Sequence, residues 1–115
     1  MDESILTSIK KLLGITEEDT SFDVDVIIHI NSAFMVLQQL GVGPERGFSI
    51  QDSMSTWSDF LTDGQQLEAV KTYIYLKVKL VFDPPASATI LEAYQRQKDE
   101  YEWRLNVAVD PAKEG

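Results

Sequence analysis

Residues 65–85 read QQLEAVKTYIYLKVKLVFDPP, and this stretch decides how the C-terminal half of the chain folds. From Tyr73 to Leu80, tyrosine and lysine side chains alternate with aliphatic ones, as they do on a half-buried strand. The same stretch carries a helical stripe, which begins upstream of the alternation and follows residues 63–66 (DGQQ), a sequence with the form of a capping box. We therefore predict a helix over residues 65–82 rather than a strand. The stripe consists of Leu67, Val70, Ile74, Val78 and Val81.

Pro84 and Pro85 end this helix, because proline lacks a backbone donor and the residue before a proline avoids the α region. Pro85 is then placed to lie in the first turn of a further helix over residues 86–109. One face of that helix is apolar, since its side chains project within about 60° of one another. We expect residues 110–115 to form a flexible tail. The apolar face consists of Ile90, Tyr94, Tyr101, Leu105 and Ala108.

The N-terminal half contains two further helical patterns. The first is a short helix whose stripe stops at Gly14, a residue suited to the left-handed C-terminal cap. The second is a longer helix that ends at Leu40, with Ser21 or Asp23 as its N-cap. The stripe of the first helix consists of Ile5, Leu6, Ile9, Leu12 and Leu13.

The longer helix has apolar side chains on two faces. One broad face is suited to the core, whereas Val24, Ile28 and Met35 cluster on nearly the opposite side. Such a helix is expected to be covered twice, by its own core and by a second body. That second body is either another helix of the same chain or another molecule. The broad face consists of Val26, Ile27, Ile30, Ala33, Phe34, Leu37 and Leu40.

Residues 41–64 are punctuated by glycine and form a long central loop. Phe48 and Ile50 alternate with polar residues, which leaves open whether residues 47–51 form a short β-arm, and residues 56–61 predict a one-turn helix. The expected fold is a single domain over residues 1–115 that is mainly all-α. It is a small bundle of about four main helices joined by this loop.

The chain is strongly acidic, with a net charge of −9 over 115 residues. Residues 1–63 contain eleven acidic and three basic side chains, whereas residues 64–115 contain eight and seven. A surface of this kind repels nucleic acid, since affinity for a duplex depends on lysine and arginine displacing phosphate counterions. The composition argues against a protein that grips DNA. It is compatible with a wall past which DNA slides, although plain solubility is the favoured explanation of the charge.

Several kinds of chemistry are not expected from this sequence. The absence of cysteine excludes disulfides, thiolate catalysis and cysteine-ligated zinc, and the single histidine, His29, cannot assemble a metal site alone. No catalytic triad or cofactor fingerprint is present, so we expect neither enzyme activity nor a cofactor. The start of the chain lacks a signal peptide, and no apolar stretch approaches the roughly 20 residues that span a bilayer. We expect synthesis in a cytoplasm-like compartment and no membrane partner.

Trp103 is the side chain for which a folded monomer has little obvious use. On the helix over residues 86–109 it projects away from the apolar face, on the side that carries Glu92, Arg96 and Asp99, with Val107 one turn later. Tryptophan and arginine are enriched at binding hot spots, which makes this side an interface candidate. The alternative is that the loop over residues 41–64 folds over Trp103. Together with the second apolar face of the longer helix, the pattern argues for self-association.

The order of these elements resembles the small head–tail connector, or neck adaptor, proteins of tailed bacteriophages. The resemblance is most specific in residues 73–85, with their Phe82-Asp83-Pro84-Pro85 exit, and in residues 102–106 (EWRLN). It implies an α-helical subunit of a dodecameric ring below the portal, which extends the DNA channel and offers a platform to the next head-closure or tail protein. The protein would then be part of the virion neck.

The resemblance also implies which residues contact each partner. The C-terminal segment would face the portal or a neighbouring copy, and Phe48 and Ile50 in the central loop would face the downstream component. Stoichiometry, the channel-lining face and the downstream partner stay open. The alternative function is a small acidic helical regulator that binds one protein partner. The C-terminal candidates are Arg96, Trp103, Arg104, Val107 and Val109.

Overall fold

The computed structural model describes residues 3–61 and 64–109, and these residues form an all-α domain. The prediction of a small helical bundle is confirmed. Residues 47–51 form no strand, so the β-arm considered for the central loop is absent. The elements in chain order are α1 (Ile5–Leu12), α2 (Asp23–Gln39), α3 (Trp57–Phe60), α4 (Gly64–Phe82) and α5 (Ala88–Val109).

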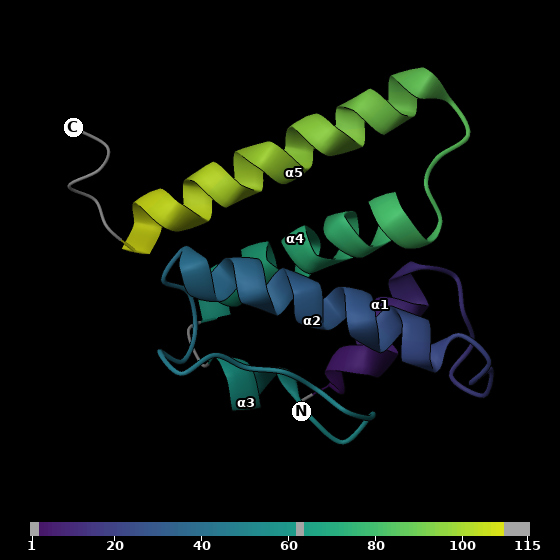
Figure 1. The fold of residues 1–115 in the computed structure, drawn as a ribbon, viewed down its shortest axis with the longest axis horizontal. Helices are drawn as coiled ribbons and strands as arrows, with labels where there is room; N and C mark the ends of the chain where they lie inside the picture. The colour runs from purple at the N-terminus through teal and green to yellow at the C-terminus, as the bar shows by residue number, and fades with distance from the viewer. Residues whose placement is uncertain (1–2, 62–63, 110–115) are drawn as a thin grey trace.

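Helix α4 is the centre of the bundle. It packs against α5 on one side and against α2 and α1 on others (Figure 1). Val70, Ile74 and Val78 of the predicted stripe are fully buried, whereas Val81 at its end is exposed. Tyr73, which lies outside that stripe, is also fully buried. Because α4 is covered on more than one side, apolar side chains surround it. This explains why a helical segment also shows a strand-like alternation.

The proline junction separates α4 from α5, as predicted, but α5 starts later than expected. The cap is Ser87, whose carbonyl accepts the Leu91 N–H at 2.9 Å and whose hydroxyl accepts the Ile90 N–H at 3.4 Å. Pro85 therefore precedes the helix instead of occupying its first turn. The cause is local. The side-chain oxygen of Ser87 accepts a hydrogen bond from a first-turn N–H group, whereas proline has no side-chain acceptor for such a group.

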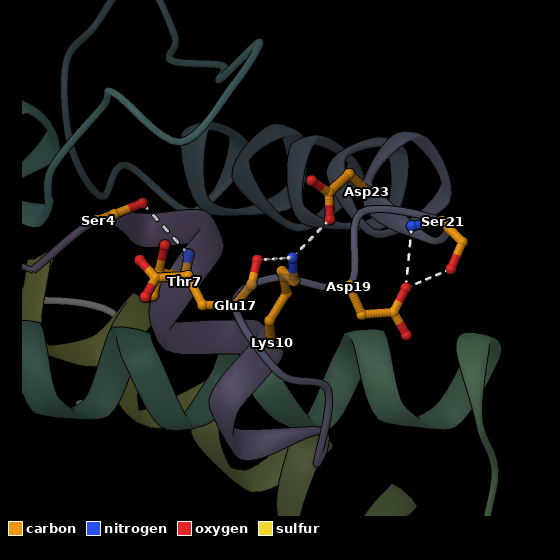
Figure 2. A network of polar contacts seen from close by, with 7 residues as sticks. All are labelled: Ser4, Thr7, Lys10, Glu17, Asp19, Ser21 and Asp23. Atoms are coloured by element: carbon orange, nitrogen blue, oxygen red, sulfur yellow. Dashed lines mark hydrogen bonds and ion pairs between the residues drawn. The ribbon is translucent and has the colours of Figure 1, made fainter.

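Helix α2 begins without the expected side-chain cap. Phe22 occupies the N-cap position, and the hydroxyl and backbone N–H of Ser21 both donate to the Asp19 carboxylate, so this hydroxyl does not cap α2 (Figure 2). The entry to α2 is held from α1, where the buried ammonium of Lys10 lies 2.9 Å from the Asp23 carboxylate and donates to the Glu17 carbonyl at 3.2 Å. This ion pair and hydrogen bond thus fix the position of the start of α2, but the ammonium is a donor and does not satisfy first-turn N–H groups as a cap would.

The described part of the central loop is anchored to the core by hydrogen bonds at Ile50 and Trp57. The Asn31 side chain exchanges two hydrogen bonds with the backbone of Ile50, at 2.8 and 2.9 Å. The predicted one-turn helix is present as α3, and the indole of Trp57 donates to Ser8 of α1 at 3.0 Å. These contacts explain why a loop of this length is ordered, because its buried polar groups find partners.

Candidate protein interface

The rotation of α5 is fixed by polar contacts on its inner side. The hydroxyl of Tyr73 on α4 donates to the Glu102 carboxylate at 2.8 Å, and the Lys98 ammonium lies 3.7 Å from the same carboxylate. One turn later the Asn106 amide donates to the Leu40 carbonyl at the end of α2 at 3.3 Å. Burial, followed by the hydrogen bond to Glu102, raises the pKa of Tyr73, so the phenol stays a neutral donor.

With the inner side fixed, Trp103 faces away from the bundle. Its side chain is 60 % exposed, so the alternative in which the central loop covers it is wrong. Arg96 is also exposed and makes no ion pair with the described residues, and Val107 is half-buried. We call these residues, Arg96, Trp103 and Val107, the α5 outer stripe.

Two other C-terminal candidates lie outside this stripe. Arg104 is exposed, but its guanidinium is already paired with Glu100 of the same helix at 2.5 Å. An exposed pair of this kind contributes little to stability and can be exchanged for a pair with a partner. Val109 is the last residue of α5, and its side chain falls outside the described part of the structure.

Helix α2 also presents apolar side chains to solvent. Val24, Ile28 and Met35 are 72, 55 and 62 % exposed, and they lie on the side of α2 that faces away from the core. The first of the two expected covers, another helix of the same chain, is therefore excluded for the described residues. We call Val24, Ile28 and Met35 the α2 outer stripe.

The two loop candidates lie in or against the core. Ile50 is 2 % exposed, and Phe48 is half-buried in a cluster with Phe34 and Phe60, at centroid distances of 5.1 and 5.4 Å. Their alternation comes from packing onto α2, and Ile50 offers no surface to a downstream partner. The exposed apolar side chain of this loop is Met54, which the sequence pattern did not single out because no periodic neighbour accompanies it.

The described residues form no cluster of side chains typical of a catalytic or metal site. No group of three or more metal-ligating side chains is found in residues 3–61 and 64–109. A groove between α4 and α5 carries Asp99, whose carboxylate is paired with Lys98 at 3.1 Å. No helix in the described ranges is long and apolar enough to cross a membrane. The exposed large apolar side chains of the described surface include Trp103 on the α5 outer stripe and all three residues of the α2 outer stripe, and these favour binding to protein.

Comparison with known proteins gives one finding. The model of a family described as phage connector protein matches residues 5–112, which is nearly the whole chain. No curated protein and no solved structure gives a significant match. The matched segment contains both outer stripes and every helix from α1 to α5.

Proposed function

The chain belongs to the phage connector protein family, and on that premise we propose that it is a structural, non-enzymatic subunit of the neck of a tailed bacteriophage particle. Family membership supports a component of the virion. The proposal adds that the subunit binds the portal, forms a ring with copies of itself and carries the downstream head-closure or tail protein. The observation that carries the proposal is Trp103, a large apolar side chain held in solvent by a helix whose other side is fixed.

The charge of the chain supports a ring through which DNA passes without binding. The net charge is −9, and residues 1–63 contain eleven acidic against three basic side chains. Such a surface offers few cationic side chains that could displace the counterions of the phosphates, so DNA should move past it without binding. Tight, salt-sensitive binding to duplex DNA in a gel-shift titration would contradict this part of the proposal.

The experiment that tests the proposal is electron microscopy of the purified chain mixed with the portal protein of the same phage. We expect a ring of additional density on one face of the portal. The portal serves as a template, because the exposed stripes are small and the chain on its own should associate only at high concentration. Unchanged portal particles at saturating concentrations of the chain would overturn the proposal.

A one-to-one complex without a ring would favour the alternative function, a small acidic regulator with a single protein partner. The same exposed Trp103 would then be the contact of that complex. The two functions therefore predict complexes of different symmetry and different copy number of this chain, and averaged images show both quantities.

A further inference from the structure

The two outer stripes have mirrored spacings. Along α2, Val24 is followed by Ile28 after four positions and by Met35 after seven more. Along α5 read backwards, Val107 is followed by Trp103 after four positions and by Arg96 after seven more. Both stripes therefore extend over roughly 16 Å at 1.5 Å per residue, and an antiparallel pairing of the helices brings all three positions into register.

From this register we propose that the α2 outer stripe of one copy packs against the α5 outer stripe of the next copy, with the helices antiparallel. Ile28 then lies against the Trp103 indole, and Val24 lies against Val107. Met35 packs on the aliphatic stem of Arg96, whose guanidinium makes no ion pair with the described residues. The assignment deepens the proposed function and rests on it, because it names the contact by which a ring would close.

Neither stripe is complementary to the same stripe on a second copy. A two-fold contact requires a self-complementary patch, and spacings of four and seven are not symmetric about their centre. Pairing α2 with α2 would also bring together the halves of the chain that hold eleven acidic and three basic side chains each. Helix α2 carries Asp23 and Asp25 and no lysine or arginine, whereas α5 carries four acidic and three basic side chains. A contact of α2 with α5 therefore brings fewer unbalanced like charges together than a contact of α2 with α2.

The placement of the stripes allows both contacts at once. Helices α2 and α5 pack on different sides of α4 (Figure 1), and each stripe faces away from it. A contact between two different faces is heterologous, and repetition of such a contact gives a closed ring or an open filament. Three side chains per face are fewer than the 20–30 that a stable interface of roughly 800 Å² per partner usually contains, so a single contact should be weak.

Cysteine cross-linking between mixed variants tests the pairing, because the chain contains no native cysteine. The Ile28→Cys variant is mixed with the Trp103→Cys variant at high concentration and oxidised, and each variant is also oxidised alone. The matched control replaces Trp103→Cys by Gln97→Cys, an exposed position on α5 outside the stripe. We expect the mixed disulfide dimer to exceed both homodimers and the Gln97 control. Equal yields from the control, or a dominant homodimer of either variant, would overturn the pairing.

A complementation experiment tests the same contact between the α2 and α5 outer stripes without a covalent bond. The Ile28→Glu variant keeps an intact α5 stripe and the Trp103→Glu variant keeps an intact α2 stripe. In sedimentation velocity each should lose association by roughly tenfold or more on its own, whereas the mixture should stop at a dimer. Higher oligomers of either variant alone would contradict the proposal. Portal binding by the unmodified chain is scored separately, so failure of the pairing is distinguishable from failure of the neck function.

Discussion

The phenol of Tyr73 on α4 donates a 2.8 Å hydrogen bond to the carboxylate of Glu102 on α5. The residue after Glu102 is Trp103, which is 60 % exposed. One interhelical bond thus fixes the rotation that places the tryptophan in solvent. Stability and the proposed interface are coupled at neighbouring residues of one helix.

Removal of the Glu102 carboxylate is expected to destabilise the fold. In Glu102→Ala the buried Tyr73 hydroxyl loses its acceptor, and the free energy of unfolding should fall by about 1–3 kcal/mol in urea denaturation. The double variant with Tyr73→Phe should cost less than the sum of the single changes, because the two groups are partners. Glu100→Ala is the matched control, since its exposed pair with Arg104 should contribute within about 1 kcal/mol. Additive single effects would exclude the coupling.

The same bond predicts a loss of stability at alkaline pH. Burial and the neighbouring Glu102 raise the pKa of Tyr73 above its usual value near 10. Above about pH 10 the unfolded chain releases this proton while the folded chain keeps it, so stability falls as the pH rises. The urea midpoint of the natural chain should therefore fall more steeply than that of Tyr73→Phe between about pH 9 and pH 11.

Burial also raises the pKa of Tyr75, so the Tyr73→Phe variant should keep part of the alkaline slope. Equal slopes for the two proteins would show that Tyr73 takes no part in the transition.

Local patterns in the sequence predicted most of the architecture. The stripe of α4 and the projection of Trp103 are local, since they depend on side chains one or two turns apart, and the structure confirms the helix and the exposure of the indole. The burial of Ile50 depends on the Asn31 amide, nineteen residues away, which binds the Ile50 backbone. No periodicity of the loop contains that contact, so the alternation alone suggests a β-arm.

The N-cap predicted for α2 is also wrong, and for Asp23 the reason is again a contact with a distant residue. The sequence predicts Ser21 or Asp23 as the N-cap of α2, because serine and aspartate are preferred at that position. The structure uses Asp23 for the ion pair with Lys10, a residue of another helix, and Ser21 for a bond with Asp19. The exposed stripe of α2 was visible as a second apolar face, but only the packed bundle shows that no described segment covers it.

The buried ion pair between α1 and α2 should be sensitive to loss of one partner. Lys10 is 3 % exposed, and Lys10→Met would leave the Asp23 carboxylate without its cation, at a cost of about 3 kcal/mol. Lys11→Met is the matched control, because Lys11 is exposed and lies 4.0 Å from Glu3. Thermal or urea unfolding of both variants checks the difference. A Lys10→Met variant as stable as the control would show that the pair contributes nothing.

Two glycines with similar backbone angles should respond differently to alanine. Gly43 has φ 89°, and an added Cβ would clash with the ring of Phe60, whereas Gly14 has φ 81° and no neighbour within 4 Å. Gly14→Ala should cost about 1 kcal/mol for the left-handed backbone alone. Gly43→Ala should cost clearly more in urea denaturation, because the aromatic cluster must also move. Similar losses at the two sites would mean that the loop accommodates the methyl group freely.

Trp103 should contribute to assembly and not to folding. Trp103→Ala removes an exposed side chain, so the free energy of unfolding should stay within about 0.5 kcal/mol of the natural chain. Portal association in a pull-down should weaken, because a subunit that loses the contact with its neighbouring copy binds the portal without the added affinity of the ring.

Leu105→Ala is the matched control two residues further along α5. Leu105 is buried, so its truncation should destabilise the fold by about 2–5 kcal/mol through a cavity. The two variants separate loss of assembly from loss of stability. Trp103→Ala should lose assembly and still unfold at the urea midpoint of the natural chain, whereas Leu105→Ala should unfold at a lower urea concentration. Full portal binding by Trp103→Ala would remove this side chain from the interface, and a large fall in its stability would show that the indole packs within the monomer.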